Sequence, residues 1–68
     1  MARKESRRFE EWAINDFLQA IKGATAEYID EKDSDDLAAI IIYATEALKM
    51  IGKNPDKAVR ELMDDPTF

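Results

Sequence analysis

The chain has 68 residues without cysteine or histidine, which excludes disulfides, thiolate metal sites and imidazole-based catalysis. Its net charge is −5, but residues 1–8 hold four bases and one acid, whereas residues 9–68 hold six bases and fourteen acids. A chain this short buries only about 60% of its unfolded surface, so we expect one domain, residues 1–68, that gains stability from helix packing or association.

A first amphipathic helix is predicted from about Ser6 to Asp30. Its apolar residues recur at three- and four-residue spacings on one face: Phe9, Ala13, Phe17, Ala20, Ile21, Ala24 and Tyr28. Gly23 lies inside this segment and costs about 1 kcal/mol relative to Ala, so one continuous helix and two shorter helices meeting at Gly23 both fit. Residues 1–5, before the helix, are expected to form a flexible basic arm.

Residues 31–36, with the sequence EKDSDD, are predicted to form the first turn. Their side chains can hydrogen-bond their own backbone and so compete with a continuing helix. Asp33 or Ser34 can cap the next helix. Asp35 and Asp36 fall in its first turn, where the helix dipole favours negative charge.

The segment from Leu37 to Ile51 is the most apolar part of the chain, since only Thr45, Glu46 and Lys49 interrupt it. A helix this apolar must be covered on more than one side. On a helical wheel one broad face, expected to form core or dimer contacts, comprises Leu37, Ile40, Ile41, Ala44, Ala47, Leu48 and Ile51. Tyr43 lies on the opposite side and is expected to contact either the first helix or a second copy of the chain.

A third helix is predicted from about Pro55 to Asp64, with Asn54 as its cap and Gly52 suited to the left-handed conformation that ends the central helix. Residues 66–68 are expected to fray. These elements predict an all-α fold, a small antiparallel three-helix arrangement in which the outer helices each present one apolar face to the central helix. Because this leaves the central helix partly uncovered, we expect a homodimer that forms a helical bundle.

Two features are candidate contact surfaces: six carboxylates crowded between residues 27 and 36, and one tryptophan at the margin of the first helix's apolar face. The predicted interaction surface comprises Trp12, Glu27, Asp30, Glu31, Asp33, Asp35 and Asp36. Trp12 is equally well explained as the edge of the core. Glu27 and Asp30 share a helix face and could ligate magnesium with oxygens from another helix, but a solvated turn is the favoured interpretation. No catalytic, cofactor-binding or metal-binding residue is assigned.

Residues 35–65 resemble the third and fourth helices of MazG-type all-α nucleotide pyrophosphohydrolases, in which an acid-rich turn precedes an apolar dimer-forming helix, a Gly-containing loop and an amphipathic helix. The resemblance implies magnesium-dependent hydrolysis built across a dimer. That family holds magnesium with a Glu-Glu-x-x-Glu helix and a Glu-x-x-Asp helix start. Here the pair Glu10–Glu11 is followed by Ile14 where the third acid belongs, and Asp36 has Ala39 as its partner position. The chain thus departs from the family at the metal-binding positions.

The sequence favours a small acidic helical module that binds proteins rather than an enzyme. It would act as an adaptor, regulator or inhibitor of a larger protein, and in one form of this hypothesis the partner protein is basic. One alternative is a degenerate MazG-like pyrophosphohydrolase. The other is nucleic-acid binding through Arg3, Lys4, Arg7 and Arg8, which the acidic body disfavours. The longest apolar run is about 15 residues against the ~20 of a bilayer span, and no apolar signal core follows the charged start, so we expect a cytoplasmic location and no membrane contact.

Overall fold

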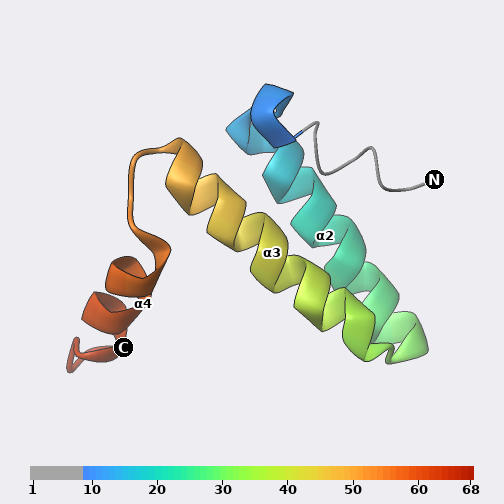
Figure 1. Ribbon diagram of the computed structural model, residues 1–68. Helices are drawn as coiled ribbons and strands as arrows, with labels where there is room; N and C mark the ends of the chain where they lie inside the picture. The colour runs from blue at the N-terminus through green and yellow to red at the C-terminus, as the bar shows by residue number, and fades with distance from the viewer. Residues whose placement is uncertain (1–8) are drawn as a thin grey trace.

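The computed structural model describes residues 9–68, and within this range the chain is all-helical (Figure 1). A short 3-10 turn, η1, precedes three α-helices. The bounds are Phe9–Glu11 for η1, Ile14–Glu31 for α2, Ser34–Met50 for α3 and Pro55–Met63 for α4. The predicted all-α fold of three helices is therefore confirmed, while the basic arm predicted at residues 1–5 lies outside the described residues.

Helix α2 begins at Ile14. The predicted first helix is therefore wrong over residues 9–13, where the structure has a 3-10 turn and a short non-helical link. Ser6, its predicted start, lies outside the described residues. The physical reason is a cap formed by the chain itself. Ala13 is extended, with φ −91° and ψ 167°, and its N–H donates to the Asp16 carboxylate at 2.8 Å. From there the helix runs unbroken through Gly23, so the single continuous helix is the correct alternative for this segment.

A tight corner joins α2 to α3. Lys32 adopts the left-handed conformation, with φ 59°, and its N–H donates to the Tyr28 carbonyl at 2.8 Å, which ends α2. Asp33 is the N-cap of α3, and its carboxylate accepts the N–H of Asp35 at 2.9 Å. Asp33, one of the two predicted caps, is confirmed, but the turn is shorter than the predicted residues 31–36: only Lys32 and Asp33 are non-helical, and α3 begins at Ser34, three residues before the apolar segment.

The connection from α3 to α4 also follows the sequence. Gly52 has φ 84°, and the Asn54 side chain accepts the N–H of Lys57 at 3.0 Å, which caps a helix that opens on Pro55. Beyond α4, residues 66–68 fold into a turn in which the Asp65 carboxylate accepts both the N–H of Thr67 at 2.9 Å and its hydroxyl at 2.8 Å.

The packing is uneven, because α2 and α3 lie side by side as an antiparallel hairpin while α4 makes few contacts with α3 (Figure 1). The third helix shares two apolar-lined hollows with the central helix, as expected of neighbouring helices, but it contacts that helix at few points and covers little of it. The connection through Gly52 turns α4 away from the hairpin and leaves its apolar side chains exposed. Among the described residues only Phe17 and Ala24 are buried, and both belong to α2.

Candidate functional site

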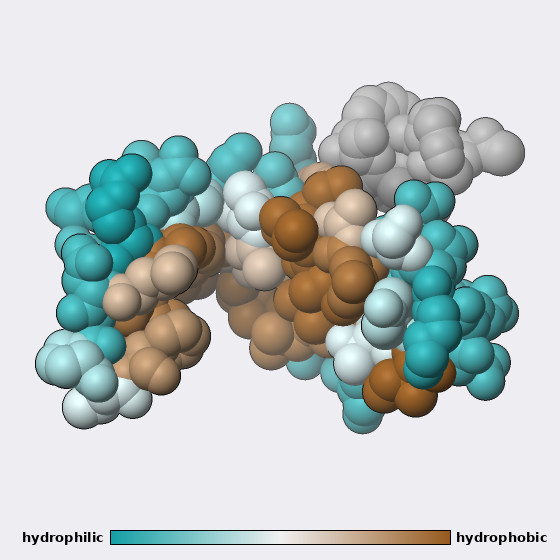
Figure 2. Space-filling view, turned by 90° about the horizontal axis from the view of Figure 1, so that it is seen from below, coloured by the Kyte–Doolittle hydropathy of each residue, from teal (hydrophilic) through white to brown (hydrophobic). Residues whose placement is uncertain are grey.

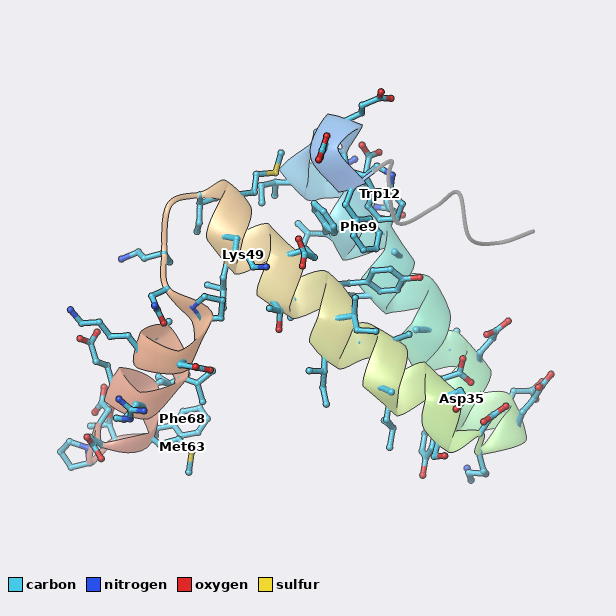
Figure 3. All side chains as sticks on the ribbon, viewed as in Figure 1. Phe9, Trp12, Asp35, Lys49, Met63 and Phe68 are labelled. Carbon is cyan, nitrogen blue, oxygen red and sulfur yellow. The ribbon has the colours of Figure 1, made fainter. Side chains whose placement is uncertain are left out.

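Four aromatic rings close one end of the hairpin (Figure 3). Trp12 packs against Phe9 with ring centroids 4.9 Å apart and against Phe17 at 4.8 Å. From α3, Tyr43 stacks on Trp12 at 5.9 Å and meets Phe9 edge-on at 6.1 Å. These centroid distances fall in the range in which aromatic pairs attract one another beyond their burial.

The aromatic cluster settles where two of the predicted site residues lie. Tyr43 contacts the segment before α2, which is the first of the two contacts expected for it. Trp12 is half-buried in the chain's own cluster rather than standing free on the surface. Its position is therefore that of a core-edge residue, and a role in binding a partner remains a prediction.

The acidic residues gather around the corner between α2 and α3. Glu27 of α2 hydrogen-bonds the carboxyl group of Asp36 of α3, and this bond, with the charge of Asp36, raises the pKa of Glu27 above its usual 4.5. The charges of Glu31 and Asp33 raise the same pKa further. The corner thus brings four of the six predicted acids within electrostatic reach of one another across the two helices.

Other polar side chains at this corner stabilise the backbone of the two helix ends. The carboxylate of Asp33 is occupied by capping α3, and Lys32 extends its Nζ to the Ile29 carbonyl at 2.9 Å. Asp30 and Asp35 are exposed. Over residues 9–68, no three acidic side chains converge closely enough to hold a metal ion.

The second surface is apolar and lies between α3 and α4. Two hollows of about 710 and 550 Å³ open there, each lined by both helices but by different residues, and we call the two jointly the α3–α4 groove. Its apolar lining comprises Ile41, Leu48, Ile51, Val59, Leu62 and Met63. Figure 2 shows this side of the molecule, with brown apolar surface over α3 at the centre and over α4 at the left. Ile41 and Met63 are 67% and 69% exposed.

The apolar face predicted on the central helix is only partly covered in the structure: some of its residues pack toward α2, and others are exposed. Ile40 and Ala47, which share the Tyr43 side of the helix, are half-buried, as is Ala44. By contrast Leu37, Ile41 and Ile51 are exposed, and α3 contains no buried residue at all. A helix with twelve apolar residues between positions 37 and 51 therefore uses one side for the hairpin and leaves the other open.

In comparisons with protein-family models, curated proteins and solved structures, the chain gives no significant match. The resemblance of residues 35–65 to the MazG-type pyrophosphohydrolases gains no support from them. Within residues 9–68, no helix has both the length and the apolar character that crossing a bilayer requires. Function is therefore inferred from the two surfaces of the chain itself.

Sequence reasoning missed two features that matter for these surfaces. The cap that starts α2 was signalled by Asp16, three residues after Ala13, which is the spacing of a capping interaction. The separation of α4 from α3 had no comparable signal, because an amphipathic stripe indicates that a helix is covered without saying by what.

Proposed function

We propose that this chain is a protein–protein interaction module, an adaptor, regulator or inhibitor that acts by binding and not by catalysis. One observation carries the proposal: the α3–α4 groove exposes large aliphatic side chains from two helices side by side. Soluble proteins rarely leave contiguous apolar patches of several hundred Å² open to water, and such patches mark contact sites for other macromolecules.

The groove has the form in which helical segments are bound. Its lining combines aliphatic side chains with polar side chains of α4, Lys57 and Glu61 at the first hollow and Asp56 and Arg60 at the second. Apolar contacts combined with polar ones are the usual anatomy of a protein interface. An amphipathic helix laid into it would bury the side chains that α4 leaves exposed.

The acidic corner supplies a second element of the proposal. Glu27, Asp36 and their neighbours concentrate negative charge at the end of the hairpin where α2 and α3 join, away from the α4 side of the groove. Such charge favours basic partners and repels acidic ones, so it sets the choice of partner more than the affinity. The proposal includes a cytoplasmic location, which cell fractionation tests.

Site-specific photo-crosslinking tests the proposal. A photoreactive residue at Ile41 lies in the groove, whereas the same residue at Ile29 lies on α2, away from it, at nearly equal exposure, 67% against 66%. We expect protein adducts from position 41, with the same chain or with another, and several-fold fewer from position 29. Equal yields at the two positions, or none at either, would contradict the proposal.

A further inference from the structure

The charges at the two ends of α3 bear on which partner occupies the α3–α4 groove. We propose that this partner is a second copy of this chain, held by a two-fold axis that pairs α3 with α3 in antiparallel orientation and lets α4 of each copy cover the open side of the other. This inference rests on the proposed function and names its partner. The starting point is that neither α3 nor α4 buries a single residue within one chain.

Helix α3 is charged with opposite sign at its two ends. Asp33, Asp35 and Asp36 lie at its start, while Lys49 lies in its last turn and Lys53 just beyond it. Figure 3 shows Asp35 and Lys49 at opposite ends of the helix. Lys49 is 3.2 Å from Glu46, but such an exposed pair is worth little and can exchange partners.

This polarity selects the antiparallel arrangement. A two-fold interface must be complementary to itself, so that each contact is made twice with the roles exchanged. With α3 helices antiparallel, the acidic start of each lies beside the basic end of the other, and the two helix dipoles oppose. A parallel pair would bring six carboxylates from the two starts together.

The register follows from the same residues. The 17 residues of α3 span about 26 Å. If the axis passes midway between Ile41 and Thr45, the start at Asp33 is level with the partner's Lys53, and Ala38 is level with the partner's Leu48. Small and large side chains then face each other across the centre, and charges pair at both ends.

The available apolar area matches what such a dimer needs. Fully burying one large aliphatic side chain removes roughly 60–120 Å² from water, so the half-exposed residues of the groove, with Leu37 and Ile42 beside it, offer several hundred Å² per chain. A standard interface buries about 800 Å² per partner, somewhat over half of it apolar. The exposed apolar side chains of α3 and α4 therefore supply a substantial part of the apolar area on one side of a standard dimer interface.

Light scattering coupled to size exclusion, over a hundredfold concentration range, tests the occupant. We expect twice the 7.8 kDa mass of one chain. Ile41→Glu should raise the dissociation constant about 100-fold, because it places a carboxylate in the apolar centre. Ile29→Glu, at matching exposure on α2, should leave it unchanged. Should Ile41→Glu unfold, Met63→Glu on α4 makes the same test without touching the hairpin.

Charge exchange tests the orientation. The Asp35→Lys and Lys53→Glu variants should each dimerise more weakly, and an equimolar mixture should form the mixed dimer in preference to either homodimer, as native mass spectrometry can count. A statistical mixture would overturn the antiparallel pairing. A wild-type monomer at every concentration would overturn the dimer, and adducts at position 41 with another protein would then leave the proposed function standing without it.

Discussion

The two sides of α3 differ more than any other two parts of this molecule. Toward α2, the helix meets Tyr43's aromatic neighbours, and the Glu27–Asp36 carboxyl pair links the two helices. Toward α4, it faces an open groove whose walls barely touch. Residues of similar hydrophobicity therefore form a core on one side and an accessible surface on the other.

The two connections account for this difference. Between α2 and α3 only Lys32 and Asp33 are non-helical, so the corner forces the helices to lie alongside each other. The four residues from Ile51 to Asn54 turn on Gly52 and impose no such contact. Local backbone geometry thus decides which apolar stripe is covered within the chain and which one remains for a partner.

The largest expected effect comes from truncating Phe17, the one large side chain that is fully buried among residues 9–68. Phe17 is 1% exposed, and Phe17→Ala should lower the free energy of unfolding by about 3–4 kcal/mol. So small a domain would then be largely unfolded. Leu62→Ala on α4 should cost under ~1 kcal/mol, since half of that side chain is already in water. Urea titrations followed by circular dichroism, at dilutions where the chain is monomeric, measure both; equal losses would mean that α4 belongs to the core.

Removing the α3 contribution to the aromatic cluster should have the next largest effect. Tyr43→Ala loses the ring contacts to Phe9 and Trp12, and we expect a loss of about 2 kcal/mol. Trp12 is the only tryptophan, so its emission should shift to the red as water reaches it. Phe68→Ala, at a ring 77% exposed, is the control that should change neither quantity; an unshifted Trp12 spectrum in Tyr43→Ala would show that the rings do not pack in solution.

Exchanging each glycine for alanine compares the two regions through the backbone alone, because nothing beyond the adjoining residues and the helix's own backbone lies within 4 Å of a Cβ added at either position. Gly23→Ala should stabilise α2 by about 0.5–1 kcal/mol. Gly52→Ala should destabilise the α3–α4 connection by about 1 kcal/mol, because φ 84° strains a residue with a Cβ. Thermal melts of the two variants should move in opposite directions, and a shift of the same sign would contradict the assigned conformations.

The smallest expected effect is the pH dependence of the hairpin. The hydrogen bond with Asp36 raises the pKa of Glu27, so the protonated form is favoured in the folded state. Its contribution is complete below about pH 4.5, its ordinary pKa, and is lost as the pH rises through the raised value. Glu27→Gln should therefore flatten the dependence of Tm on pH in this window, whereas Glu61→Gln on α4 should not. An unchanged slope in Glu27→Gln would mean that the two carboxyl groups do not interact.

Much of the fold could be predicted because local chemistry determines it. Asp33, Gly52, Asn54 and Pro55 each fix a helix boundary through a backbone preference or a cap, and the structure places them in those roles. The same kind of reasoning failed at the start of α2. The apolar spacing of Phe9 and its successors continues the helical period, but tertiary contacts among the aromatic rings hold Phe9 in a separate turn.

The surfaces were less predictable than the helices. Periodicity identified the apolar residues of α3 but could not assign Ile40 to a half-buried position and Ile41 to an open groove, because that depends on where α2 and α4 lie. The crowding of acids near the corner was legible in the sequence, whereas the contact between Glu27 and Asp36 requires the hairpin to have formed. The sequence shows which residues are acidic or apolar, but it does not show which residues distant in the chain come into contact.

The connection between α3 and α4 has a consequence for how the chain tolerates change. Residues 51–54 are all exposed, and this segment carries no side chain into the hairpin core. A protease should cut there first, and extra residues inserted after Gly52 should leave the hairpin intact while altering the reach of α4. Changes in the length of this connection therefore alter the distance between α3 and α4, and with it the size of the partner that fits between them, while the α2–α3 hairpin stays the same.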